Sequence, residues 1–312
     1  MAKILIKTSD ISREKWLEYR RTGIGGSDAA TVCGLNPSSS LIELWADKTG
    51  RLPEKEDNEA MRTGRDLEEY VAKRFCETTG KKVERRNAIF QHGKYDFILA
   101  NIDRKVVGEN AGLECKTTNA FNRSDFESGE IPLYYYVQCM HYMNVMGFDK
   151  MYLAVLVGGQ RFYWFEIPYD KDEADKLLEA EVEFWNEYII PDVRPEPDGS
   201  DSAGRVLGGL YNKKRDGEIT LFPQEKTALK LMEIKGKIKQ LKTDEERLKQ
   251  QLILAMDGNT KGITETCEFS NKTYERASVN SKKLKDLYPE IYKEVCKTST
   301  VQVFNISERK VK

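Results

Sequence analysis

Hydrophobic residues recur at helical spacing in one long segment of the chain. Leu67, Val71 and Phe75 lie four residues apart, and Gly80 follows the last of them. This spacing places the three side chains on one face of a helix, and a glycine commonly ends such a helix. We therefore predict a helix over residues 58–79.

Short apolar runs bounded by glycine or charged residues indicate strands. Residues 151–157 (MYLAVLV) and 161–167 (RFYWFEI) flank a pair of glycines, which predicts a hairpin. Residues 95–103 (YDFILANID) and 112–117 (GLECKT) flank a turn-rich stretch, and we predict a second hairpin from them. Strands and helices mixed in this way predict an α/β fold. Further helices are predicted over residues 10–23, 28–34, 39–50, 132–147 and 170–190.

The composition changes after the last of these helices, which indicates a domain boundary. Residues 191–205 (PDVRPEPDGSDSAGR) are rich in Pro, Gly, Ser and Asp, as linkers and long loops are. Residues 223–312 hold 19 Lys and Arg against 13 Asp and Glu, whereas residues 1–222 hold 31 against 38. We predict a first domain over residues 1–205, a linker over 206–222 and a C-terminal accessory domain over 223–312.

The accessory domain is predicted to begin with one long helix and to continue as a small α+β unit. After Gly258 the polar and apolar residues alternate as in strands, and a short helix over 281–288 and a strand over 300–306 follow. The long helix carries a heptad-like seam. Because the seam spans only a few heptads, we favour packing within its own domain over an oligomer contact. The seam consists of Leu231, Ile234, Ile238, Leu241, Leu248, Leu252 and Ala255, with Glu245 the one misfit.

Composition and charge then restrict the chemistry. The 312 residues carry 50 Lys and Arg against 51 Asp and Glu, so a nucleic acid or a membrane would have to bind a local patch. No apolar stretch is long enough to cross a bilayer and no secretion signal is evident, so we expect a cytoplasmic protein. The six cysteines form no CxxC pair, and there are only two histidines. Chemistry must therefore come from carboxylates, Lys, Arg and backbone groups.

The most informative group of polar residues is Asp103 with Glu114 and Lys116. Side chains alternate along a strand, so Glu114 and Lys116 would face a cleft while Leu113 and Cys115 face the core. A hairpin would bring Asp103 close to Glu114, and two adjacent carboxylates repel each other unless a cation lies between them. Mg²⁺ or Mn²⁺ with oxygen ligands would satisfy both. The alternative interpretation is a solvated strand face.

Glu68 is a further carboxylate on the apolar face of the helix over residues 58–79. It lies three, four and seven residues before Val71, Ala72 and Phe75, so its side chain points inward. An inward carboxylate needs a partner. That partner is a metal ion if Glu68 belongs to the acidic group, or otherwise a salt bridge or capping contact.

Residues 16–50 (WLEYRRTGIGGSDAATVCGLNPSSSLIELWADKTG) closely resemble the opening of the YqaJ-type viral recombinase nucleases. These are relatives of lambda exonuclease in the PD-(D/E)XK nuclease superfamily. The resemblance continues through TGRDLEEYVAKRF (63–75), ANIDR (100–104), LECKT (113–117) and YYVQCMHYMNVMG (135–147). It implies a PD-(D/E)XK core, with a central mixed sheet flanked by helices, over most of residues 10–190.

The resemblance also assigns roles to single residues. Asp103, Glu114 and Lys116 match the core motif of the superfamily, and the backbone carbonyl of Cys115 would be a further metal ligand. Glu68 matches the upstream helical carboxylate. The motif reads Asn-Ile-Asp rather than Pro-Asp, which keeps the carboxylate, and QCM stands where relatives often carry QVQ. The remaining matches are Gln138, the glutamine of the following helix, and Arg20 and Ser27, which correspond to residues that hold a 5′ phosphate.

The function implied by the resemblance is a Mg²⁺-dependent exonuclease, with Mn²⁺ as a substitute. It would degrade linear double-stranded DNA from 5′-phosphorylated ends and act in phage recombination with a single-strand annealing protein. A trimeric ring, as in lambda exonuclease, is a weaker implication. Two alternatives stay open: an endonuclease of the same fold, and a non-catalytic DNA-end-binding scaffold. The glycine-rich segment over residues 23–28 can direct backbone N–H groups towards an anion, or form an ordinary turn with an N-cap.

Overall fold

The structure is a computed structural model that describes residues 2–53, 57–211, 217–297, 304 and 306. By its internal contacts the chain divides into two units, Met1–Lys213 and Lys214–Lys312. The domain and linker limits expected from the sequence stay predictions. No helix in the described ranges is both long and apolar enough to span a membrane.

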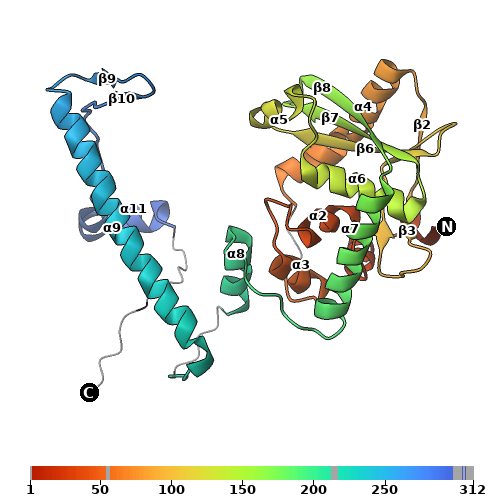
Figure 1. Cartoon of the computed structure of the whole chain (residues 1–312), viewed down its shortest axis with the longest axis horizontal. Coiled ribbons are helices and arrows are strands. Elements are labelled where there is room, and N and C mark those ends of the chain that lie inside the picture. Colours follow the sequence, from red (N-terminus) through yellow and green to blue (C-terminus); the bar gives the residue numbers. More distant parts are fainter. Residues whose placement is uncertain (1, 54–56, 212–216, 298–303, 305, 307–312) are drawn as a thin grey trace. The chain divides into compact units, whose positions relative to one another are not determined.

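A five-stranded mixed sheet forms the centre of the first unit (Figure 1). The strand order is β2-β5-β6-β7-β8, in which β6 and β7 are parallel and all other neighbours are antiparallel. Together with its flanking helices, the sheet confirms the expected α/β fold class. The strands are β2 (Val83–Arg85), β5 (Arg104–Val106), β6 (Ala111–Thr118), β7 (Lys150–Val157) and β8 (Arg161–Pro168).

Helices cover both faces of this sheet. On one face α4 (Glu59–Thr79) packs Phe75 into a core cluster that includes Leu113 of β6. On the other face α6 (Leu133–Met146) and α7 (Lys171–Phe184) share a second core cluster with the alternate residues of β7. The strand side chains therefore enter two separate cores, as the period of two along a strand requires. The helix α4 agrees with the predicted helix over residues 58–79.

The N-terminal segments form a smaller layer beside this sheet. Strands β1 (Lys3–Lys7), β3 (Ala88–Gln91) and β4 (Leu99–Ala100) make a three-stranded sheet. Helices α1 (Arg13–Arg21) and α2 (Gly26–Val32) follow β1 in the chain, and α2 packs on α6. Among the described residues, the remaining α-helices of the unit are α3 (Leu41–Lys48), the short α5 (Ser124–Glu127) and α8 (Asp201–Leu210), and a π-helical turn (Trp185–Ile189) extends α7.

Two sequence predictions in this unit are wrong. The run over residues 95–103 is not one strand: only Leu99–Ala100 is extended, and it pairs with β3 instead of with β6. The partner of β6 in the hairpin is β5, which begins one residue after Asp103. In addition, residues 201–205, which we read as loop, begin helix α8. Its N-cap Ser200 accepts a hydrogen bond from the Ala203 backbone N–H, because serine caps helices as well as favouring turns.

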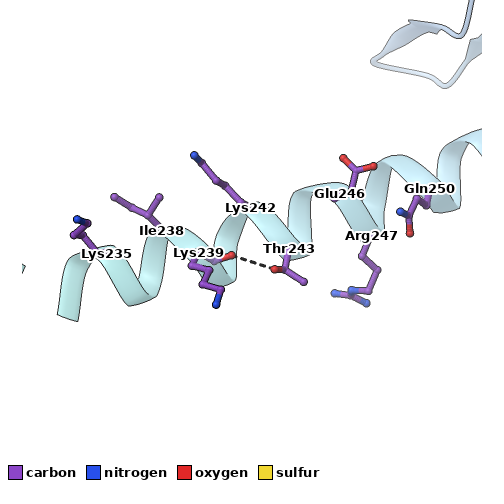
Figure 2. A pocket seen from close by; sticks show the side chains of 8 residues that line it. All are labelled: Lys235, Ile238, Lys239, Lys242, Thr243, Glu246, Arg247 and Gln250. Atoms are coloured by element: carbon purple, nitrogen blue, oxygen red, sulfur yellow. Dashed lines mark hydrogen bonds between the residues drawn. The ribbon is translucent and has the colours of Figure 1, made fainter. Parts of the chain in front are cut away.

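The first long helix of the second unit is α9 (Glu225–Ala255), as predicted, and it follows the short 3-10 helix Phe222–Gln224; the expected packing of its seam within the domain stays a prediction. No residue of α9 is buried, so the described residues do not cover the heptad-like seam. An open hollow of about 730 Å³ is lined only by residues of α9. Figure 2 shows their side chains projecting from the helix, among them Ile238, Lys242 and Glu246.

The rest of the second unit consists of short strands and helices. The predicted strands over 263–278 reduce to the pair β9 (Lys261–Ile263) and β10 (Glu268–Ser270). Two short helices follow, α10 (Ser281–Leu287) and α11 (Pro289–Val295), and the first matches the predicted helix over 281–288. The predicted strand over residues 300–306 lies almost entirely outside the described residues.

Candidate active site

Strand β6 and the bend before β5 bring Asp103, Glu114 and Lys116 together. The Asp103 Oδ2 atom accepts a hydrogen bond from the Cys115 backbone N–H, with an N···O distance of 2.8 Å. On the same face of β6, Lys116 Nζ lies 2.7 Å from Glu114 Oε1. The expected proximity of the three side chains is therefore present, although the hairpin that produces it starts later than predicted.

Helix α6 supports the carboxylate of Glu114 from behind. Gln138 Nε2 donates to Glu114 Oε1 at 2.6 Å and to the hydroxyl of Tyr142 at 3.0 Å. Gln138 and Tyr142 are four residues apart and so share one face of the helix. Since Glu114 is only 3% exposed, these contacts hold its carboxylate in one orientation.

The buried carboxylates make this site strongly electronegative. Burial and the charges of Glu114 and Glu68 raise the pKa of Asp103 well above its usual value. Burial acts to lower the pKa of Lys116, but the carboxylates of Glu114 and Asp103 outweigh it and raise that pKa above the usual range. As an ammonium group, Lys116 can donate a hydrogen bond to a water or phosphoryl oxygen.

The chemistry of these donors fits a hard divalent cation. Glu114 Oε2 is buried and has no hydrogen-bond partner among the described residues, which costs free energy unless another group satisfies it. A cation bound by Asp103 and Glu114 would supply that partner and reduce their repulsion. Within the described ranges, however, His, Cys, Asp and Glu side chains form no group of three or more that could hold a metal ion. The wider ligand set with Glu68 and the Cys115 carbonyl stays a prediction.

Glu68 is directed inward from α4, as predicted, but its carboxylate pairs with an arginine. Arg104 Nη1 lies 2.5 Å from Glu68 Oε1. Glu114 points towards α6, whereas α4 packs on the opposite face of β6, with Leu113. Glu68 therefore stands in an ion pair with Arg104, and its place among the metal ligands stays a prediction.

The residues expected to seat a phosphate also meet. Arg20 Nη2 donates to Ser27 Oγ at 2.7 Å, and the Arg20 guanidinium lies 4.8 Å from the centre of the Trp16 ring. Arg20 comes from the last turn of α1 and Ser27 from the first turn of α2. Donors at a helix N-terminus beside a guanidinium favour a bound anion.

Asp28 supports this phosphate seat and makes a capping contact at the start of α2. Its Oδ2 accepts from the Gly25 backbone N–H at 3.0 Å and from Lys48 Nζ at 2.6 Å. Lys48 Nζ also donates to the backbone carbonyl of Arg20 at 3.0 Å. Burial would raise the pKa of Asp28, but the charges of Lys48 and Arg20 outweigh it and lower that pKa. The seat thus rests on a buried ion pair between α2 and α3.

The two groups of residues open onto the same cavity. A cavity of about 200 Å³ is lined by Arg20 and Ser27 and also by Asp103, Lys116 and Gln138. Trp16, Asn101 and Tyr142 complete much of its polar and aromatic wall. An anion held by Arg20 and Ser27 would therefore lie in the space that Lys116 faces.

Sequence reasoning missed several residues of this site. Lys48 and Arg104 were not singled out because each acts through partners that lie 20 or more residues away in the chain. Tyr142 could have been found from the sequence, because it lies four residues after Gln138 and therefore on the same face of the predicted helix. Arg104 also had one: it directly follows Asp103, so it enters β5 beside the acidic group.

Comparison with known proteins gives both relatives and solved structures. Residues 15–149 match the family described as the YqaJ-like viral recombinase domain. The chain is 41% identical over 313 residues to the uncharacterized protein YqaJ of Bacillus subtilis (strain 168), with 98% of each chain covered. The alkaline exonuclease LHK-Exo of Laribacter hongkongensis is 20% identical, with a TM-score of 0.48 over 56% of this chain and 91% of that one. A phage related exonuclease of Haemophilus somnus 129PT is 14% identical, with a TM-score of 0.42 over 55% and 96%.

Proposed function

Because the chain belongs to the YqaJ-like viral recombinase family, we propose that it is a Mg²⁺-dependent exonuclease for linear double-stranded DNA. It degrades the strand that carries a 5′ phosphate, in the 5′→3′ direction. The resemblance noted from the sequence places the family among divalent-metal-dependent nucleases, and Mn²⁺ is expected to substitute for Mg²⁺. We propose further that the enzyme works with a single-strand annealing protein in phage or prophage recombination.

The observation that carries this proposal is the shared cavity. Arg20 and Ser27 line it together with Asp103 and Lys116. A phosphate seat inside the reaction cavity suits an enzyme that starts at a DNA end, because the terminal phosphate can enter there. An endonuclease has no need of such a seat, and a non-catalytic scaffold has no need of buried carboxylates facing phosphate.

The residues of the chain have distinct tasks in the proposed reaction. Arg20 and Ser27 bind the terminal 5′ phosphate and fix the register of the strand. The Lys116 ammonium donates to the attacking water or to the phosphoryl oxygens, where negative charge develops. Gln138 holds the carboxylate of Glu114 in place. When bound by Asp103 and Glu114, a divalent cation would supply Lewis-acid stabilisation and lower the pKa of water.

The products of the reaction fit the same seat. Water adds to the phosphorus of the second nucleotide, and the bond from that phosphorus to the 3′ oxygen breaks. The released nucleotide keeps its 5′ phosphate and gains a 3′ hydroxyl. The shortened strand again ends in a 5′ phosphate, which Arg20 and Ser27 can bind in the next cycle.

Linear and circular duplexes of the same sequence test the proposal. With Mg²⁺, the wild type should release mononucleotides from the linear form and leave the covalently closed circle intact, and chelation by EDTA should stop the release. Lys116→Ala should lower the rate by at least about 100-fold while DNA binding persists, since the ammonium acts on developing charge. Lys15→Ala is the matched control, because Lys15 is exposed and pairs with Glu18. Equal cleavage of circles, or full activity of Lys116→Ala, would contradict the proposal.

A further inference from the structure

Tyr142 lines the cavity of the candidate site, but the proposed reaction gives it no task. The residue is almost fully buried, with 5% of its surface exposed. Its hydroxyl accepts a hydrogen bond from Gln138 Nε2 at 3.0 Å. A tyrosine hydroxyl can also donate one hydrogen bond, and a buried donor without an acceptor costs free energy. Among the described residues, no group accepts the proton of the Tyr142 hydroxyl.

The hydroxyl of Tyr142 reaches the first turn of α2. A Cβ atom at Gly26 would lie 2.6 Å from two ring carbons of Tyr142 and 3.0 Å from its hydroxyl oxygen. Because Gly26 carries no Cβ, the ring fits against this turn, directly before Ser27. Helix α2 packs on α6, the helix that carries Tyr142. The hydroxyl therefore lies beside the phosphate seat that Arg20 and Ser27 form.

Ser27 has the same hydrogen-bond pattern as Tyr142. Its Oγ accepts from Arg20 Nη2 at 2.7 Å, and no group in the described ranges accepts its own proton. Two hydroxyl groups on one cavity wall thus each accept a hydrogen bond and each have a proton left to donate. A ligand that only accepts hydrogen bonds would satisfy both. Since the Arg20 guanidinium lines the same cavity, this ligand is an anion.

We propose that Tyr142 is the third donor of the phosphate seat, and that its hydroxyl donates to the terminal 5′ phosphate that Arg20 and Ser27 bind. This inference rests on the proposed function, which supplies that phosphate. A terminal phosphate is a monoester with three oxygens outside the ester bond, whereas a phosphodiester within the strand has two. Three donor groups around one cavity therefore favour a strand end over the interior of a strand, and Tyr142 contributes to that specificity.

A purely supporting role for Tyr142 predicts a different behaviour. Its hydroxyl also accepts from Gln138, which holds the carboxylate of Glu114. If this contact were its only task, loss of the hydroxyl would slow the reaction by the same factor at every DNA end, phosphorylated or not. A donor to the terminal phosphate stabilises the phosphorylated end alone, so its loss changes the ratio of the two rates.

The ratio of kcat/KM for the 5′-phosphate and 5′-hydroxyl ends of one linear duplex, measured on the full chain with Mg²⁺, tests the inference. Tyr142→Phe removes the hydroxyl and keeps the ring against Gly26. It should lower the ratio by about fivefold or more, as expected for the loss of one hydrogen bond to a charged group. Tyr136→Phe is the matched control: it removes a hydroxyl of the same helix that donates to Glu173 at 2.6 Å, and it should keep the wild-type ratio. An unchanged ratio in Tyr142→Phe would overturn the inference, even if both rates fall.

Measuring both ends on one variant also controls for folding. Any loss of folded protein lowers the two rates together and cancels in their ratio. If Tyr142→Phe yields no folded protein, as judged by circular dichroism, Tyr142→Met, which also lacks the hydroxyl, is measured in its place. A wild type that degrades both ends at the same rate would contradict the proposed function itself. A wild-type preference for the phosphorylated end that Tyr142→Phe retains would remove only this inference.

Discussion

At the scale of single residues, one carboxylate joins the reaction centre to the helix behind it. Glu114 pairs with Lys116 on its own strand and accepts from Gln138 of α6. Strand alternation was enough to place Glu114 and Lys116 on the same face from the sequence. The buried partners Arg104 and Lys48 could not be found in that way, because their contacts depend on how distant segments pack.

Gly26 gives a prediction at this scale. A Cβ atom at this position would lie 2.6 Å from two ring carbons of Tyr142, whose hydroxyl accepts from Gln138. Gly26→Ala should therefore shift Tyr142 and the Gln138–Glu114 contact, and lower kcat by about 100-fold. Gly204→Ala on α8 is the control, because a Cβ there meets no atom within 4 Å. Nucleotide release and urea unfolding would be measured for both. An unchanged kcat for Gly26→Ala would argue that Tyr142 has no part in the site.

At the scale of elements, strongly periodic segments were predictable and irregular ones were not. The segment over 58–79 forms α4 because its apolar positions repeat and because Asn58 and Gly80 end it. The segment over 95–103 is apolar for another reason: Ile98, Leu99 and Ala100 are buried, but only two residues are extended. A buried segment that pairs with a neighbouring strand over only two residues has the same apolar sequence pattern as a full strand. A short apolar run alone does not separate the two cases.

The contact between α6 and α7 gives a pH-dependent prediction. His141 and Glu181 are fully buried; Nδ1 of His141 lies 2.6 Å from Glu181 Oε1, and Nε2 lies 2.7 Å from the Leu99 carbonyl oxygen. Burial acts to lower the pKa of His141, but Glu181 and the Leu99 carbonyl outweigh it and the pKa is raised. In the unfolded chain the pKa of a histidine is about 6.5. Because the pKa of His141 is higher in the folded state, the pair makes its full contribution to stability at pH values below the unfolded pKa. That contribution is lost as the pH rises through the folded pKa.

The measurement is the free energy of unfolding in urea from pH 5.5 to 9. The free energy of unfolding of the wild type should exceed that of the double variant His141→Gln/Glu181→Gln by the largest amount at pH 5.5. This difference should shrink as the pH rises. Glu181→Gln alone leaves His141 buried without its counter-ion and should cost about 3–5 kcal/mol at low pH. A difference that grows towards alkaline pH would show that His141 is buried in its neutral form.

At the scale of the whole molecule, composition predicted less than local patterns did. The Ser-, Gly- and Asp-rich stretch before residue 206 reads as a linker, yet its last part belongs to α8. There Ser202 Oγ accepts a hydrogen bond from the Ser40 backbone N–H at 3.1 Å, so this stretch packs within the first unit. Serine and aspartate are as common at helix starts as in loops, so composition alone could not separate the two. The long helix α9 was predictable, and the trimeric ring stays a prediction.

The end-phosphate preference tests the central claim most directly, because it requires the phosphate seat and the reaction centre to work as one site. The initial rate of nucleotide release is measured on linear duplexes that differ only in a 5′ phosphate or a 5′ hydroxyl, for the wild type and for Arg20→Ala. We expect the wild type to degrade the phosphorylated end at least about tenfold faster, and Arg20→Ala to lose most of that ratio. Arg21→Ala, on the same helix and paired with Asp47, should keep it. Equal rates on both ends in the wild type, or an unchanged ratio in Arg20→Ala, would contradict the account.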